Sequence, residues 1–437
     1  MKIKYYYIVV LLILSPAIFA VLRKVWPGQP NWFEVMPSVV IALFIPVFIY
    51  KKDFLKLPKP FALIWLSILI IYFYGLLVAV SSGIAKIGLL CFILRCSLMF
   101  LVPMVYFTFR TPESILKFAN ILSIFCIIVA VGGLWQISLP EHCPTIFSAT
   151  EQTIEYYDSF QAGLTEYGVN LRSGIREATS IFASNAKLSY FAYSSLFILM
   201  ACIFWIKTYR FHWDNRIIWI GIISAFILLV IANRRGLFIS GILGILLFYK
   251  KIKIKHKGKI ALIFIAAFLL FLFNDYFSTI EVGKFSRFGM LADAFDRGIL
   301  IFRIQIILDY AMTYIYSHLF LGGGMGSSGQ EAVNLKSANW ISTEMGIIQW
   351  IIEYGLFPML LVLSLHLRLI WKSWIFRKRL GSEMKVIAYF QLSLFLLFLL
   401  KEVAMFGSGN ASLLFFWVSV GIVARWLMLS KTMPIYI

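Results

Sequence analysis

The sequence is poor in charged residues and poorest in acidic ones. Charged side chains make up 14% of the 437 residues, and only 20 residues are Asp or Glu, whereas a soluble domain carries about 25% charged residues. The five cysteines lie at 91, 96, 126, 143 and 202, and their spacing fits neither a disulfide framework nor a metal motif. These shortages, with 61% hydrophobic residues, exclude a soluble enzyme, a soluble nucleic-acid-binding domain and a disordered chain.

What the chain has instead is a series of apolar runs of about 15–23 residues, the length that crosses a bilayer. We predict an all-α polytopic membrane protein, a single integral-membrane domain over residues 1–437. The first run continues into Arg23 and Lys24 without a small-residue cleavage site, which indicates an uncleaved helix. The predicted membrane helices, about twelve, cover residues 5–22, 31–50, 61–80, 86–109, 115–137, 188–206, 217–233, 236–249, 260–273, 345–367, 386–402 and 411–429.

The distribution of Lys and Arg predicts the orientation of these helices. A formal net charge of +20 would suggest nucleic acid in a soluble protein, but in a membrane protein basic residues gather in the cytoplasmic loops. Here they are dense in the short loops 51–60, 207–216, 250–259 and 368–385. These loops and both termini are therefore predicted to be cytoplasmic, and we expect no nucleic-acid partner.

Two long loops, 138–187 and 274–344, are then predicted to be extracytoplasmic and to contain short helices. Loops of this length usually carry function or are disordered. The second loop contains an apolar stretch, 291–316, that we expect to lie on or dip into the membrane surface. It also contains a glycine cluster at 322–326, which predicts a turn where backbone can approach a ligand closely.

Familiar catalytic motifs are absent from the sequence: it has no Walker loop, no GxSxG and no HExxH. Only His142 and His318 are expected on the outer side, so we predict neither a multi-histidine metal site nor a cofactor. The remaining candidates are charged side chains at the outer ends of helices and in the outer loops. Charges near membrane depth are costly and therefore indicate function.

Arg303 is the most isolated of these charges. It lies in an apolar stretch, and none of the residues at helical spacing from it is acidic. It either binds a phosphate or carboxylate bidentately or snorkels to lipid headgroups. Arg234 and Arg235 follow the predicted helix 217–233 on its outer side. They form either an anion clamp beside the next helix N-terminus or interfacial anchors, and Arg235 is the preferred candidate.

Three further charges lie in predicted membrane helices or at their ends. Glu344 stands before the helix 345–367, where a carboxylate either complements the helix dipole or acts as a general base. Glu353 lies nine residues further along and is the more buried candidate, suited to a structural pair. Arg95 lies inside the helix 86–109 without a local partner, and we predict that it pairs with Glu402.

The remaining candidates for substrate binding lie in the two outer loops. Arg172 and Arg176 stand among Glu166 and Glu177, so local ion pairing is the alternative for both. The full set of substrate-binding candidates is Arg172, Arg176, Arg234, Arg287, His318, Gly324 and Asn339. Arg287 precedes Gly298 by eleven residues, a spacing that is common by chance.

Four local patterns, in this order and placement, resemble the O-antigen ligase/polymerase superfamily of the Wzy and WaaL type. They are Val131–Gln136 (VGGLWQ), Arg176–Asn185 (REATSIFASN), Asn233–Gly236 (NRRG), and Arg303 followed by Ser317–Gly326 (SHLFLGGGMG) with Glu353–Leu356 (EYGL) in the next helix. The second pattern departs from the family's R…G-T-F-x-N-P-N by lacking the Gly and the Pro. The resemblance spans about residues 115–360.

One departure distinguishes the branches of this family. Its ligases carry a histidine eleven residues before the glycine of E-x-G-L, and here Glu344 holds that position. The resemblance therefore implies a polymerase of O-antigen, capsule or exopolysaccharide repeat units, with Glu344, Arg303 and Arg235 as catalytic residues. An O-antigen ligase or another lipid-linked glycosyltransferase is the first alternative. A transporter or flippase is the second, although the chain lacks inverted halves.

The resemblance also implies the substrates, the partners and the location. Members of the family transfer a glycan from an undecaprenyl pyrophosphate carrier to another lipid-linked glycan, without a metal or another cofactor. The expected partners are these lipid-linked glycans, membrane lipid, a flippase and a chain-length regulator. The expected location is a bacterial inner membrane.

Overall fold

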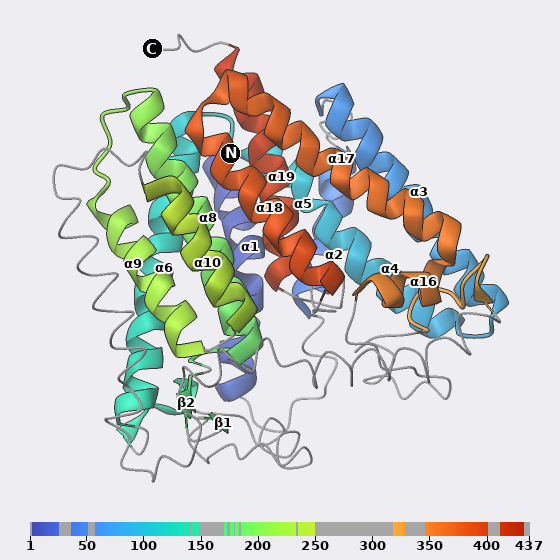
Figure 1. Cartoon of the computed structure of the whole chain (residues 1–437), viewed down its shortest axis with the longest axis horizontal. Coiled ribbons are helices and arrows are strands. Elements are labelled where there is room, and N and C mark those ends of the chain that lie inside the picture. Colours follow the sequence, from blue (N-terminus) through green and yellow to red (C-terminus); the bar gives the residue numbers. More distant parts are fainter. Residues whose placement is uncertain are drawn as a thin grey trace. The chain divides into compact units, whose positions relative to one another are not determined.

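The computed structural model describes most of the chain, and the described part is helical except for one short β-hairpin (Figure 1). The described residues are 2–25, 36–50, 57–139, 142–147, 170–172, 175–178, 180–182, 185–232, 235–249, 318–327, 346–400 and 411–431. The α-helices are α1 (Lys2–Val25), α2 (Met36–Tyr50), α3 (Lys59–Ser81), α4 (Ala85–Met99), α5 (Leu101–Thr108), α6 (Pro112–Ser138), α8 (Asn185–Thr208), α9 (Arg216–Ala232), α10 (Arg235–Tyr249), α16 (Gly346–Tyr354), α17 (Leu356–Leu380), α18 (Ser382–Leu400) and α19 (Ala411–Ser430).

Within the described residues, eight helical segments are long and apolar enough to cross a membrane. They are Tyr5–Leu22, Lys59–Ser81, Ala85–Thr108, Pro112–Ser138, Ala186–Thr208, Leu356–Phe376, Ser382–Leu399 and Leu413–Ser430, and three shorter apolar helices accompany them. The prediction of an all-α, multi-pass membrane protein is therefore confirmed. The predicted helix 260–273 lies outside the described residues.

The predicted helix 345–367 is wrong as a single element. α16 ends at Tyr354, and α17 begins at Leu356 and runs to Leu380, so that most of the predicted loop 368–385 is helical. Gly355 separates the two helices with φ +79°, a left-handed conformation that glycine adopts without the steric cost of a side chain. The apolar pattern continues across this glycine, which is why the sequence predicts one helix there.

The chain forms two compact units, each with its own packed core. Unit 1 comprises residues 1–16, 31–114 and 297–435, and unit 2 comprises residues 17–30, 115–296 and 436–437. In unit 2, α8 is the central helix, because its whole apolar window is buried. In unit 1, Gln391 of α18 accepts a hydrogen bond from Ser373 of α17 at 2.8 Å and donates one to Ser419 of α19 at 2.9 Å. This chain of hydrogen bonds satisfies polar groups that have no access to water.

The first long loop carries the two strands. β1 (Asn170–Arg172) pairs antiparallel with β2 (Ile175–Glu177), and a short 3₁₀ helix (Thr145–Phe147) precedes them. Figure 1 shows the hairpin near the lower end of α6 and below α10. The all-α prediction does not include this hairpin.

Candidate functional site

The glycine-rich turn 318–327 caps the C-terminal end of α16. The last carbonyl groups of an α-helix have no partner within the helix. Here Gly323 N–H donates to Ile352 O at 2.7 Å, and Gly324 N–H donates to Glu353 O at 3.0 Å. In return, Leu356 N–H donates to Leu319 O at 2.7 Å. The turn and the EYGL segment, which the sequence analysis treats as separate patterns, are therefore one interlocked structure.

Packing explains why this turn needs glycine. Gly324 has φ +92°, and a Cβ atom added there would lie 2.4 Å from the backbone of Ala79 in α3. The next residue, Met325, donates its N–H to Gly75 O of the same helix at 3.0 Å. The glycines thus allow the backbone of the turn to pack closely against α3.

The backbone donors of the turn are all occupied by protein acceptors. Gly322 N–H bonds to His318 O, Gly326 N–H bonds to the Glu353 carboxylate at 3.3 Å, and Ser327 N–H bonds to Gly324 O. No N–H group from 322 to 327 is left for a ligand. Substrate binding by His318 and Gly324 stays a prediction, and it would have to use other atoms of the turn.

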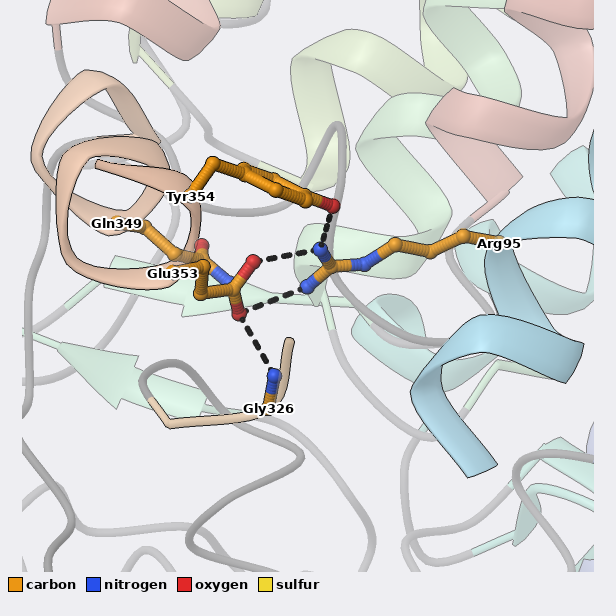
Figure 2. Close-up of polar contacts among 5 residues, drawn as sticks. All are labelled: Arg95, Gly326, Gln349, Glu353 and Tyr354. Carbon is orange, nitrogen blue, oxygen red and sulfur yellow. Dashed lines mark hydrogen bonds and ion pairs between the residues drawn. The ribbon is translucent and has the colours of Figure 1, made fainter. Parts of the chain in front are cut away.

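A buried ion pair holds this structure to α4 (Figure 2). Arg95 donates from Nη1 to Glu353 Oε2 at 2.6 Å and from Nη2 to Glu353 Oε1 at 3.0 Å, the two-point geometry that makes such pairs strong and directional. Arg95 Nη1 also donates to the Tyr354 hydroxyl at 2.8 Å, and Gln349 Nε2 donates to Glu353 Oε1 at 3.3 Å. The predicted pairing of Arg95 with Glu402 stays a prediction, because Glu402 lies outside the described residues.

The role of Glu353 follows from its burial and from its contacts. Its side chain is 0% exposed and that of Arg95 is 1% exposed. The carboxylate joins three segments, because it receives donors from α4, from the glycine turn and from α16 itself. A buried carboxylate that accepts these hydrogen bonds and pairs with an arginine is suited to positioning the segments around it.

A second cluster brings two of the four sequence patterns together in unit 2, beside the end of α9. Ser180 N–H donates to Gln136 Oε1 at 2.8 Å, and Ser180 Oγ donates to Val129 O at 2.8 Å. Two residues earlier, Ala178 N–H donates to Ile231 O at 3.0 Å, close to the end of α9. The VGGLWQ and REATSIFASN segments thus meet at one end of the unit, beside the last turn of α9.

Ser180 is the hub of this cluster, and its backbone is strained. It has φ +50°, which is uncommon for a residue other than glycine. Its carbonyl oxygen accepts a hydrogen bond from Lys24 Nζ at the end of α1. Strained residues persist where the surrounding structure holds them, and they concentrate at functional sites.

The predicted arginines of this region lie on elements that the cluster joins. Arg172 ends β1, Arg176 lies in β2, and Arg235 is the first residue of α10. The bond between Ala178 and Ile231 joins the residue after β2 to the last turn of α9. The strand that carries Arg176 therefore lies near the end of the helix that precedes α10. The other predicted site residues, Glu344, Arg303, Arg234, Arg287 and Asn339, lie outside the described residues.

Sequence reasoning missed two participants in these clusters. The sequence indicates for Lys24 only that it follows the first membrane helix. It does not indicate that Glu353 forms an ion pair with Arg95. A signal for the ion pair exists, because two opposite charges at membrane depth require partners. The residues that the structure describes contain no group of three His, Cys, Asp or Glu side chains that could hold a metal ion.

The fold and these clusters define a multi-pass membrane protein. No family model matches the sequence, and no curated protein matches it. The functional argument therefore depends on the residues and on the contacts between them.

Proposed function

We propose that this chain is a polymerase of lipid-linked oligosaccharide repeat units in a bacterial inner membrane. It has about twelve membrane helices, both termini in the cytoplasm, and its active site on the outer side. It transfers a glycan from undecaprenyl pyrophosphate to another lipid-linked glycan. A flippase supplies the repeat units, and a chain-length regulator acts on the same product.

Contacts within the units support the proposed topology. Phe61 and Phe376 lie at helix ends assigned to the cytoplasmic side, and their rings are 5.9 Å apart. Gln136 and Ser180 lie at the opposite side in the same assignment and form a hydrogen bond of 2.8 Å. Contacts of this kind require that the joined helix ends face the same side of the membrane.

The observation that carries the proposal is the meeting of the sequence patterns. In the sequence, the VGGLWQ, REATSIFASN and NRRG segments span residues 131 to 236. In unit 2 the bonds of Ser180 and Ala178 join the first two of them to each other and to the end of α9, the helix that precedes NRRG. The fourth pattern and EYGL interlock in unit 1 in the same way. The order of the patterns along the chain and these contacts together support the proposal.

The chemistry assigned to these residues is a glycosyl transfer. The acceptor hydroxyl oxygen attacks the anomeric carbon of the donor glycan, and the bond from that carbon to the pyrophosphate oxygen breaks. The electron pair leaves with undecaprenyl pyrophosphate, and the hydroxyl proton passes to the carboxylate of Glu344. Arg235 and Arg303 neutralise the charge that develops on the leaving pyrophosphate.

The test is a polymerisation assay with the purified protein in lipid nanodiscs and lipid-linked repeat units. We expect a ladder of lipid-linked oligomers. Arg235→Ala and Arg303→Ala should lose it, and Arg303→Lys should rescue poorly because an ammonium lacks the planar fork of guanidinium. Lys378→Ala, at an exposed position of α17, is the matched control and should be fully active.

The products separate the alternatives. Transfer of glycan only to a non-repeating lipid acceptor would indicate a ligase. Movement of the lipid-linked unit across the membrane without a new glycosidic bond would indicate a transporter. Full activity of Glu344→Gln would remove that residue from its role as the base, while leaving the transfer reaction itself in place.

A further inference from the structure

Lys24 is a buried lysine in the unit 2 cluster. It lies just beyond the apolar span Tyr5–Leu22 of α1, and it is only 7% exposed. A lysine ammonium carries three N–H donors. Within the described residues, one of them is used, in the bond to the Ser180 carbonyl oxygen.

Among the side chains that the structure describes, little balances the charge of Lys24. Burial lowers the pKa of Lys24 to about 7, and the opposing influence comes from the thiol of Cys143. No carboxylate of the described residues contributes to this balance. A buried ammonium without an anionic partner is costly, so the group either loses its proton or acquires an anion.

The neighbouring segments carry three arginines and one acidic residue, Glu177 of β2. The Ser180 turn follows the hairpin that carries Arg172 and Arg176, and its backbone is bonded near the start of α10, where Arg235 lies. The first turn of α10 also contains no acidic residue, and free N–H groups at a helix N-terminus favour anions. In the proposed topology, these arginines lie on the side of the membrane where the positive-inside rule disfavours basic residues.

We propose that Lys24 is a ligand for a phosphate group that binds at the unit 2 cluster, with its Nζ shared between Ser180 O and a phosphate oxygen. Under the proposed function, on which this assignment of the natural ligand rests, that group is the pyrophosphate of the lipid carrier. The competing reading is a neutral amine whose only task is to hold the Ser180 turn.

The test measures binding of inorganic pyrophosphate to the purified full-length protein, by calorimetry and by the thermal shift of unfolding. The wild type should bind and be stabilised beyond the effect of sodium chloride at the same ionic strength. Lys24→Gln keeps a donor for Ser180 O but has no charge, and we expect it to bind about tenfold more weakly or worse. Lys24→Arg should bind within a few fold of the wild type. Lys86→Met, at an exposed lysine of α4, is the control and should be unchanged.

Each result of the binding measurements either supports or contradicts the role of Lys24 as a phosphate ligand. Wild-type affinity in Lys24→Gln would overturn the proposal, and so would the absence of pyrophosphate binding to the wild type. If Lys24→Gln unfolds, the Lys24→Arg variant decides between the two readings. A lysine that is neutral and only structural would not tolerate the permanent charge of arginine, so a folded Lys24→Arg that binds pyrophosphate supports the proposal and an unfolded one contradicts it. None of these measurements uses glycan transfer. A protein that binds pyrophosphate through Lys24 but makes no polymer would refute the proposed function and leave the phosphate site standing.

Discussion

Glu353 shows at the scale of one residue how a charge can be kept at membrane depth. Its two carboxylate oxygens accept hydrogen bonds from Arg95, Gly326 and Gln349. The charge is thereby matched by a guanidinium on α4 and by neutral donors on two other segments, the glycine turn and α16. Replacing the carboxylate would remove or weaken each of these hydrogen bonds. Glu353 should therefore tolerate little substitution.

Glu353→Gln should therefore be strongly destabilising. It leaves the Arg95 guanidinium buried without its counter-charge, a change that typically costs about 3–5 kcal/mol. Thermal unfolding of the purified variant in detergent measures the loss, with the exposed Glu113→Gln of α6 as control. Arg95→Gln combined with Glu353→Gln should recover part of it, because no charge is then left unpaired. A stability equal to that of the wild type in Glu353→Gln would contradict the role given to the ion pair.

The sequence could not identify this pair, although both charges are visible in it. Helical spacing shows partners only within one helix, and Arg95 and Glu353 are 258 positions apart. The choice of Glu402 as partner had no contact information behind it. The Ser180 cluster was likewise hidden, because a positive φ at a serine and a bond from a lysine 156 positions away leave no local pattern.

At the scale of elements, the interruption between α16 and α17 is the feature that departs most from expectation. The long apolar runs predicted the other described membrane helices well. A bilayer stabilises an apolar helix of this length whatever packs against it. The prediction failed at Gly355 because the break between the two helices is stabilised by a segment that is distant in the sequence. The carbonyl groups at the end of α16 accept hydrogen bonds from residues 323–324 of another segment. A prediction from a short stretch of sequence does not include such a distant contact.

Gly324→Ala should destabilise the cap for two separable reasons. Positive φ at a residue with a side chain costs about 1–3 kcal/mol, and the new Cβ would also meet the Ala79 backbone at 2.4 Å. Gly83→Ala is the matched control, because Gly83 has φ +78° and nothing lies within 4 Å of an added Cβ. Unfolding of the two variants should therefore show a clearly larger loss for Gly324→Ala. Equal losses would mean that contact with α3 does not matter.

At the scale of the whole molecule, the native cysteines provide a test of topology. Four of the five are buried, and Cys143 is partly exposed in the first long loop. A membrane-impermeant maleimide applied to intact spheroplasts should label the protein, and Cys143→Ser should abolish the signal. A cysteine introduced at Ser382 in that background should react only after lysis. Labelling of the Ser382 position in intact spheroplasts would reverse the proposed orientation.

The rate of that labelling should depend on pH in a defined direction. Burial raises the pKa of the Cys143 thiol, and the charge of Lys24 opposes the shift only in part. Maleimide reacts with the thiolate, so a raised pKa leaves less of the reactive form at neutral pH. The rate should keep rising with pH beyond the point where a free cysteine thiol levels off.

The distance in sequence between Arg95 and Glu353 also has a consequence for biogenesis. A ribosome that adds about 5–20 residues per second needs roughly 13–52 s to cover the 258 positions between them. Throughout that interval α4 is already made, but its guanidinium lacks the carboxylate that neutralises it in the finished protein. The nascent chain must therefore shelter this charge at the insertion machinery, or at the lipid headgroups, until α16 emerges and the two halves of the pair can meet.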